Sequence, residues 1–279
     1  MSKEKITILR IKEKSPLGCI REMSNEHIPY GPYEKFIKRP LDCFLATGAI
    51  VLMSPLMAGT AYLVKKKLGS PVIFIQIRPG KDEKLFKLYK FRTMTDERDA
   101  EGNLLPDEER LTPFGRALRE SSLDELPELF NIIKGDMAIV GPRPQLVEDM
   151  MFMTPEQRKR HAVRQGLTGL AQSNGRNSIS WEQRFQYDLR YVNHITFLED
   201  VKILWKTVAK VLAREGISEA GRATSEDLGD YLLHQGKVDR QTYERKKELA
   251  RELVRSAEKP QLRKPFQFRG KTREPETLR

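Results

Sequence analysis

The sequence contains little cysteine and histidine, which argues against disulfide bonds and against a structural zinc site. Only Cys19 and Cys43 occur, far apart in the chain, so we expect no disulfide framework and a reducing compartment. The four histidines have no ligand-like spacing, which argues against a zinc site. The first residues also lack the apolar stretch and small-residue cleavage site of a secretory signal.

Long apolar runs are equally scarce. With 39% hydrophobic and 32% charged residues and a mean hydropathy of -0.56, the chain is too polar to lie mostly within a membrane, so any membrane contact must be local. The net charge of +11 favours an anionic partner. Nucleic acid, an anionic bilayer surface and phosphorylated substrates all satisfy that condition.

One apolar run does occur, from Leu41 to Val64, and Asp42 is its only acidic or basic side chain. As a continuous helix it would be roughly 36 Å long, enough to span a bilayer core of about 30 Å. Basic residues flank it on both sides, whereas a crossing helix usually has them on one side. Pro55 interrupts helical hydrogen bonding, and Ser54 can bond the freed groups. We therefore expect a re-entrant hairpin over residues 36–68; a single span and a buried core helix are the alternatives.

The remaining pattern predicts a small α+β catalytic domain over residues 69–218. The expected strands are 71–77, 85–91 and 137–140. The expected helices are 114–119, 125–133, 155–163, 181–191 and 198–213, with a polar glycine-containing loop at 166–177. Residues 1–35 are predicted to be an N-terminal extension and residues 219–279 a charged C-terminal extension with an amphipathic helix at 243–257.

Two adjacent carboxylates, Asp124 and Glu125, stand at a predicted helix start. A structural explanation is available: Ser122 with Glu125 fits a capping box, or Asp124 is the N-cap with Pro127 in the first turn. A functional explanation is that such a carboxylate acts as a nucleophile or binds a metal ion, while nearby backbone donors hold phosphate oxygens.

Several cations accompany this pair. Arg143 lies between two prolines directly after a predicted strand, so its direction is restricted in a way that suits phosphate binding, although a stiff loop with a solvated arginine is the alternative. Arg119 could converge on the carboxylates or form a surface ion pair. Lys90 and Arg92 share a face of a predicted strand, and Arg176 lies in the polar loop. Phosphoryl transfer between anionic partners requires such a set of cations and a metal ion.

Seven short motifs occur in the order typical of one family. They are Lys38-Arg39-Pro40-Leu41-Asp42, Ser54-Pro55, Lys90-Phe91-Arg92-Thr93-Met94, Leu111-Thr112-Pro113-Phe114-Gly115-Arg116, Ser122-Leu123-Asp124-Glu125-Leu126-Pro127, Gly141-Pro142-Arg143-Pro144 and Gly175-Arg176-Asn177. From about Phe36 to Ser218 the chain resembles the bacterial sugar transferases, in the small monotopic phosphoglycosyl transferase group. Two positions depart from the family pattern: Glu128 replaces the expected Gln, and Ala138 replaces a common Ser.

The resemblance implies a topology as well as a fold. It implies a small membrane-associated catalytic domain with surface amphipathic helices and a re-entrant helix broken at Ser54-Pro55. Lys38, Arg39 and Asp42 would lie at the membrane interface, with both termini on the cytoplasmic face of the bacterial inner membrane. The chain looks like the compact form of the family, without the multi-pass domain of larger relatives. A homodimer is a further expectation.

The resemblance also implies a reaction. Asp124 would attack the β-phosphate of a UDP-sugar, release UMP and carry a covalent sugar-phosphate, which polyprenyl (undecaprenyl) phosphate then takes up as glycoconjugate assembly begins. Glu125 would assist, and both carboxylates would bind Mg²⁺. Downstream glycosyltransferases are possible partners. The implied substrate-binding residues are Lys90, Arg92, Arg119, Arg143 and Arg176.

Three other functions agree less well with the sequence. A nucleic-acid-binding regulator is disfavoured because the basic residues are spread out rather than clustered with aromatics. An inert scaffold for glycan assembly is disfavoured by the intact Asp124-Glu125 pair. An ordinary glycosyltransferase that releases UDP would be expected to carry an Asp-x-Asp motif, which is absent near the predicted site.

Overall fold

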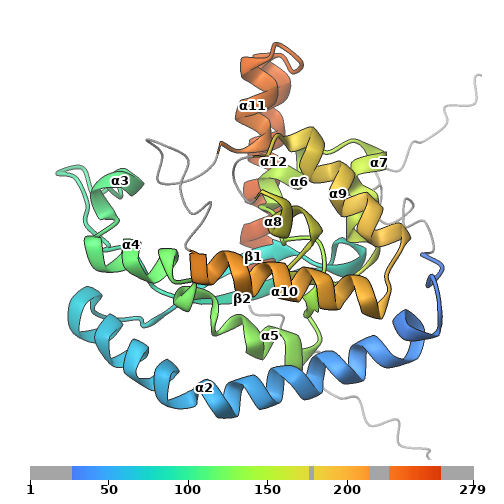
Figure 1. Cartoon of the computed structure of the whole chain (residues 1–279). Helices are drawn as coiled ribbons and strands as arrows, with labels where there is room; N and C mark the ends of the chain where they lie inside the picture. Colours follow the sequence, from blue (N-terminus) through green and yellow to red (C-terminus); the bar gives the residue numbers. More distant parts are fainter. Residues whose placement is uncertain (1–26, 176–178, 214–225, 259–279) are drawn as a thin grey trace, which may run out of the picture.

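The computed structural model describes residues 27–175, 179–213 and 226–258. A long helix, α2, runs along one side of the molecule, and short helices and two small sheets form the body above it (Figure 1). The predicted mixture of helix and sheet is therefore confirmed. The expectations for residues 1–26 and for Arg176 lie outside the described residues.

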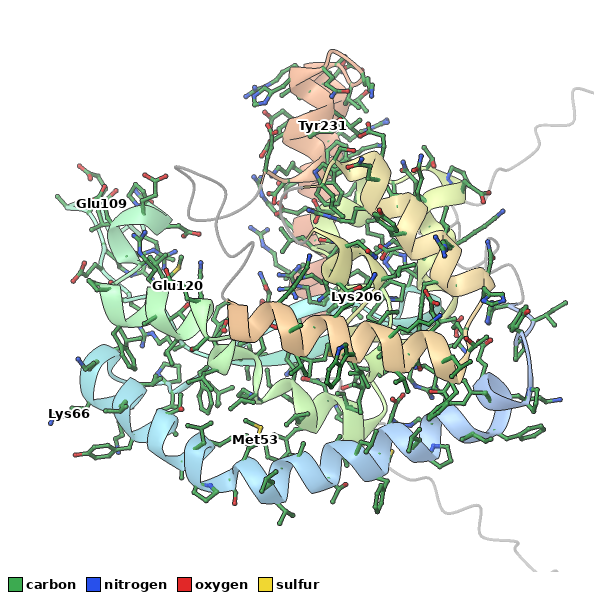
Figure 2. All side chains as sticks on the ribbon, viewed as in Figure 1. Met53, Lys66, Glu109, Glu120, Lys206 and Tyr231 are labelled. Carbon is green, nitrogen blue, oxygen red and sulfur yellow. The ribbon has the colours of Figure 1, made fainter. Side chains whose placement is uncertain are left out.

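Helix α2 (Lys38–Leu68) follows a π-helical turn, η1 (Tyr33–Ile37), and ends at Gly69, whose φ of 83° suits glycine. Together they form the one helix of the described residues that is long and apolar enough to cross a membrane. Figure 1 shows α2 as a bow with both ends turned toward the body, and Figure 2 places Met53 near its middle.

The expected break at Ser54-Pro55 is not present, because helix continues through both residues. Pro55 has no N–H to donate to the carbonyl of Val51, but the Ser54 hydroxyl donates to that carbonyl at 2.9 Å. The side chain therefore satisfies the acceptor that proline leaves free, and the helix bends without separating into two.

The two sheets have two strands each within the described residues. Strand β1 (Ile73–Pro79) pairs antiparallel with β2 (Leu85–Phe91) around the turn η2 (Lys81–Glu83). Strand β3 (Met137–Val140) pairs in parallel with β4 (Gln165–Thr168). The prediction of a loop at 166–177 was wrong for β4, because a strand of four residues with a glycine and a distant partner gives little local signal.

The other helices are short and mostly surround the sheets. They are α3 (Asp107–Arg110), α4 (Pro113–Glu120), α5 (Glu128–Lys134), α6 (Val147–Phe152), α7 (Pro155–Arg158), α8 (Leu170–Asn174), α9 (Trp181–Asn193), α10 (Phe197–Ala213), α11 (Leu228–His234) and α12 (Arg240–Glu258). The helix predicted at 155–163 is divided into α7 and the 3₁₀ turn η4 (Lys159–Ala162). The helix predicted at 243–257 lies within α12, and α3, α6, α8 and α11 were not predicted.

Polar side chains fasten the first part of α2 to the body. Lys38 pairs with Asp200 of α10, and both side chains are buried. Arg39 donates to two carbonyls at the end of α5, at 2.6 and 3.0 Å. Asp42 accepts from the backbone N–H of Ile139 in β3. These three residues of the first motif thus bind protein groups, and they fix where α2 leaves the body.

The C-terminal helices pack on the side of the body away from α2 (Figure 1). The buried side chains of Ala250 and Leu253 in α12 form a cluster with Ile77, Val147 and Met150 of β1 and α6. Helix α11 also contacts α6. Residues 226–258 are therefore docked on the α+β body.

Three glycines allow β3, β4 and the loops that follow them to approach closely. A Cβ atom on Gly166 would lie 2.1 Å from the nitrogen of Gly141, and one on Gly169 would lie 2.2 Å from the oxygen of Gly141. A Cβ atom on Gly141 would in turn lie 2.5 Å from the carbonyl oxygen of Arg164. Any side chain at these three positions would separate the two strands.

Candidate active site

Asp124 lies in a 3₁₀ turn, η3 (Leu123–Glu125), between α4 and α5. The expected capping box is wrong, because Ser122 adopts a left-handed conformation with φ of 55° and its side chain caps nothing. Asp124 is not the N-cap of α5 either, since that position is Pro127. Neither structural explanation for the carboxylate pair therefore holds.

Asp124 is a buried carboxylate without a partner among the described residues. Its side chain belongs to a residue only 8% exposed, and it accepts no hydrogen bond and forms no ion pair with another residue that the structure describes. Burial, and next the charge of Glu125, raise the pKa of Asp124 to about 6. The carboxylate is thus ionised at neutral pH and is not occupied by a structural bond.

Glu125 is held on one oxygen by two cations. Lys90 Nζ lies 2.7 Å and Arg143 Nη2 lies 2.8 Å from Glu125 Oε1. Burial opposes ionisation of Glu125, but these two cations outweigh it and lower its pKa. Lys90 also lies 3.1 Å from Oε1 of Glu128, which is 2% exposed. Burial raises the pKa of Glu128, with a smaller contribution in the same direction from Glu125.

Arg119 approaches Asp124 from α4. Its Nε donates to the hydroxyl of Thr93 at 3.1 Å, and the charge of Asp124 acts on its guanidinium, whose pKa burial lowers. A Cβ atom on Gly115 would lie 1.7 Å from the carbonyl oxygen of Thr93, so α4 and the segment after β2 are in direct backbone contact. This contact sets the position from which Arg119 extends.

The structure does not bring Arg92 into the cluster. Its guanidinium donates to two backbone carbonyls and pairs with Asp96, so it fastens the segment after β2. Lys90, Arg119 and Arg143 therefore surround the carboxylates, as the sequence predicted, whereas Arg92 has other partners. Arg176 lies outside the described residues.

Two arginines that the sequence did not point to hold the loop that carries Arg143. Arg160, which is 0% exposed, donates to the carbonyl of Arg143 at 2.6 Å and pairs with buried Asp188 at 2.8 Å. Arg78 donates to the carbonyl of Pro144 at 3.2 Å. These contacts join segments far apart in sequence, so no local pattern could have predicted them.

The carboxylates of Asp124 and Glu125 are too few to hold a metal ion such as Mg²⁺ without oxygen atoms from a bound substrate. Among the described residues no group of three or more carboxylate, histidine or cysteine side chains could hold a metal ion. Mg²⁺ is nevertheless often bound by one or two carboxylates together with substrate phosphates. The unpartnered carboxylate of Asp124 beside Glu125 fits that second arrangement.

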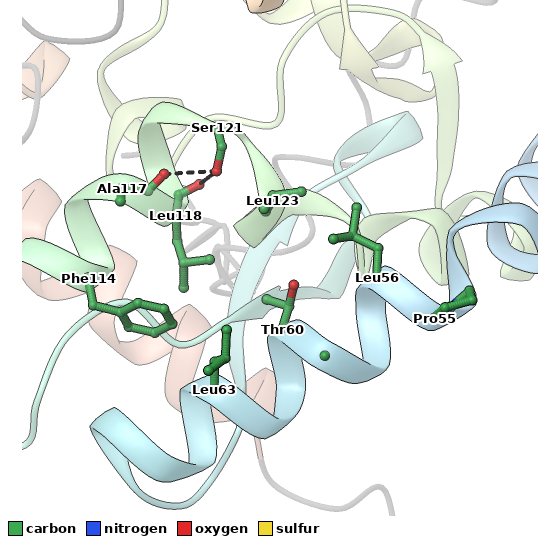
Figure 3. Close-up of a pocket in the computed structure, with 10 residues that line it drawn as sticks. Pro55, Leu56, Thr60, Leu63, Phe114, Ala117, Leu118, Ser121 and Leu123 are labelled. Carbon is green, nitrogen blue, oxygen red and sulfur yellow. Dashed lines mark hydrogen bonds between the residues drawn. The ribbon is translucent and has the colours of Figure 1, made fainter.

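An apolar cavity of about 400 Å³ lies between α2 and α4, next to the turn η3 (Figure 3). Its lining residues are Pro55, Leu56, Gly59, Thr60, Leu63, Phe114, Ala117, Leu118, Ser121 and Leu123. The Ser121 hydroxyl donates to carbonyls of its own helix, as the dashed lines in Figure 3 show. The cavity thus connects the membrane-type helix to the residue preceding Asp124 while presenting mainly hydrocarbon.

Comparison with known proteins supports a shared origin for this arrangement. The family model described as "Bacterial sugar transferase" matches residues 33–214. That range contains α2, both sheets, the carboxylates Asp124, Glu125 and Glu128, and the cations around them. Helices α11 and α12 lie outside it.

Three relatives illustrate the range of similarity. "Uncharacterized sugar transferase EpsL" of Bacillus subtilis is 51% identical over 190 residues, covering 68% of this chain and 94% of that protein. "Undecaprenyl-phosphate galactose phosphotransferase" of Salmonella typhimurium is 35% identical over 65% of this chain and 42% of that protein. "UDP-glucose:undecaprenyl-phosphate glucose-1-phosphate transferase" of Klebsiella pneumoniae is 37% identical over 65% of this chain and 41% of that protein. The chain thus matches less than half of the length of the last two.

Proposed function

Because this chain belongs to the bacterial sugar transferase family and is an enzyme of the phosphoglycosyl transferase class, we propose that it moves a sugar-1-phosphate from a UDP-sugar to polyprenyl phosphate and releases UMP. The observation that carries the proposal is the buried, unpartnered carboxylate of Asp124 beside the cations that bind Glu125. An anionic substrate can be held there without displacing a structural bond of the nucleophile.

In the first step a carboxylate oxygen of Asp124 attacks the β-phosphorus of the UDP-sugar. The new bond joins that oxygen to phosphorus, the bond from phosphorus to the bridging oxygen breaks, and UMP leaves with the electron pair. Arg143 is half-exposed and can contact phosphate oxygens while it also binds Glu125. Arg119, on α4, supplies a second positive charge that acts on Asp124.

In the second step a phosphate oxygen of the polyprenyl phosphate attacks the same phosphorus and displaces the Asp124 carboxylate. The product is a polyprenyl diphosphate sugar, and the enzyme returns to its starting state. The apolar cavity between α2 and α4 offers a place for the first isoprene units, because its wall includes Leu123, the neighbour of the nucleophile.

Mg²⁺, held by Asp124 and Glu125 with substrate oxygens, would neutralise charge on the diphosphate when bound. The protein's own cations have a separate task. Lys90 lies between Glu125 and Glu128 and stabilises both as anions, so that Glu125 remains in place next to Asp124.

We further propose that α2 enters the cytoplasmic leaflet of the inner membrane and returns. Several large apolar side chains of α2 and α10 are exposed, among them Leu52 at 83% and Trp205 at 77%. Such surface is costly in water and favourable in a bilayer. The attachment of α2 to Asp200 near one end, together with the bow in Figure 1, favours a helix that stays on one side.

The decisive experiment measures nucleotide release from lipid-embedded protein with Mg²⁺, polyprenyl phosphate and a panel of UDP-sugars. We expect UMP, and we expect Asp124→Asn to abolish its release because an amide is a poor nucleophile. Asp82→Asn is the matched control, since Asp82 is exposed and its left-handed conformation suits asparagine.

Each outcome has a distinct meaning. UMP that depends on Asp124 supports the proposal and identifies the donor sugar. UDP instead of UMP would indicate ordinary glycosyl transfer and contradict it. UMP release that survives in Asp124→Asn would remove the aspartyl intermediate while leaving the overall reaction.

A further inference from the structure

Arg184 in α9 is a cation whose role the reaction above does not explain. Its guanidinium carbon lies 4.3 Å from the ring centroid of Trp181, one turn earlier on the helix. The side chain is partly buried, and it forms no hydrogen bond or ion pair with any residue in the described part of the chain. Arginine that has lost much of its water usually gains a carboxylate or phosphate partner.

The surroundings of Arg184 lead directly to the active-site loop. Asp188 lies four residues further along α9, on the same face, and it is already paired with Arg160. Arg160 in turn donates to the carbonyl of Arg143. Burial, opposed by Asp188 and Asp149, lowers the pKa of Arg184, and repulsion from Arg143 and Arg160 adds to it. Arg184 therefore lies on the face of α9 whose Asp188 supports, through Arg160, the loop that carries Arg143.

The C-terminal unit fixes the platform on which Arg184 rests. Trp181 is 7% exposed, and its indole N–H donates to the carbonyl of Glu226 at 3.2 Å. The backbone N–H of Leu228 donates to Asp149 at 2.9 Å. Both contacts come from residues beyond the range that the family model matches. The chain thus uses its own extension to hold the ring on which Arg184 stacks and a carboxylate whose charge acts on Arg184.

We infer that Arg184 is a further substrate-binding residue, which binds phosphate oxygens of the UDP-sugar together with Arg143. This inference rests on the proposed function. The donor is favoured over the lipid phosphate because α9 lies across the body from α2, where the acceptor enters (Figure 1). Two arginines without a shared carboxylate can approach one diphosphate from two sides, and stacking on Trp181 limits the motion of one of them.

The test compares Arg184→Gln and Arg184→Lys with Arg190→Gln, a control on an exposed position of the same helix. Full-length, lipid-embedded enzyme is assayed for the KM of the UDP-sugar, the KM of polyprenyl phosphate and inhibition by UMP. If Arg184 makes a charge-assisted hydrogen bond to the donor, Arg184→Gln should raise the KM of the UDP-sugar by about 10-fold or more. UMP inhibition should weaken as well, acceptor KM should stay within about 2-fold, Arg184→Lys should be intermediate, and Arg190→Gln should match wild type.

Other results would overturn the inference. An unchanged donor KM in Arg184→Gln would give Arg184 a purely structural role, and a change confined to acceptor KM would assign it to the lipid phosphate. If Arg184→Gln lowers the melting temperature, Arg184→Lys decides, since it keeps the charge and the aliphatic contact with Trp181; wild-type donor KM and UMP inhibition in that variant would also count against specific phosphate binding. Wild-type UMP release in the same assay separates these outcomes from failure of the proposed function.

Discussion

Glu128 gives the sharpest test of the electrostatics at this site. It is 2% exposed, shares Lys90 with Glu125, and stands where the family pattern led us to expect glutamine. Burial, and to a smaller extent Glu125, raise its pKa from 4.5 to about 7. A folded-state pKa above the unfolded value means that the folded state binds the proton more tightly. The contribution of Glu128 to stability is therefore complete below pH 4.5 and is lost as the pH rises toward 7.

We expect Glu128→Gln to remove this loss. Glutamine keeps the shape and an oxygen that can accept from Lys90, but it has no charge to bury. The shift in pKa sets an upper bound of about 3 kcal/mol on the stabilisation above pH 7. Because Lys90 also interacts with Glu125, on the order of 1–3 kcal/mol is a reasonable range, and each kcal/mol corresponds to about 2–4 °C in melting temperature for a domain of this size.

The assay is thermal unfolding of both proteins in the same lipid or detergent from pH 4.5 to 8.5. The difference in melting temperature should be near zero at the acid end and should grow until about pH 7, where the pKa of Glu128 lies. Glu109→Gln, at an exposed position labelled in Figure 2, controls for the loss of a surface charge. A difference that does not change with pH, or a variant less stable than wild type at pH 8, would refute the reasoning.

Three other predictions follow from the same cluster and from α2. Turnover should rise with pH through about 6, where the raised pKa of Asp124 puts its ionisation, and a pH–rate profile that is flat from 5 to 8 would contradict this. Lys90→Met should lower the free energy of unfolding by about 3 kcal/mol, because Glu125 and Glu128 lose their shared cation; denaturant unfolding measures it, and a loss below 1 kcal/mol would argue against the pairing. Pro55→Ala restores the backbone N–H and should straighten α2, so that cysteine labelling finds more N-termini outside the cytoplasm; an unchanged labelling pattern would show that Pro55 does not set the topology.

Much of the active site could be predicted from the sequence because its motifs are local. Lys90 and Arg143 each lie in a short recognisable motif, and Arg119 stands between two such motifs; the structure gathers the three around Asp124 and Glu125. Alternation along a strand also suggested Arg92, but the strand ends at Phe91. Arg92 lies just beyond that end and binds the carbonyls of Ser70 and Met94 and the carboxylate of Asp96.

The support of the site could not be predicted in the same way. Arg160 binds the Arg143 carbonyl and Asp188, contacts that join three separate elements. Strand β4 forms because it pairs with β3, although helices α6 and α7 separate the two strands in the sequence. Helix α2 continues through Pro55 because the Ser54 hydroxyl binds the carbonyl of Val51. The Ser-Pro pair in the sequence is compatible with either a continuous helix or a broken one, so the sequence did not decide between them.

The close approach of Gly141, Gly166 and Gly169 sets a rule for building hybrid enzymes from related chains. The backbone at these positions is in direct contact, so a Cβ atom on any of the three would overlap with the facing backbone. A crossover placed between residues 141 and 166 would join halves from two parents whose strand spacing was adjusted separately. Crossovers before β3 or after Gly169 would transfer the interlocked segment whole, together with the loop that carries Arg143.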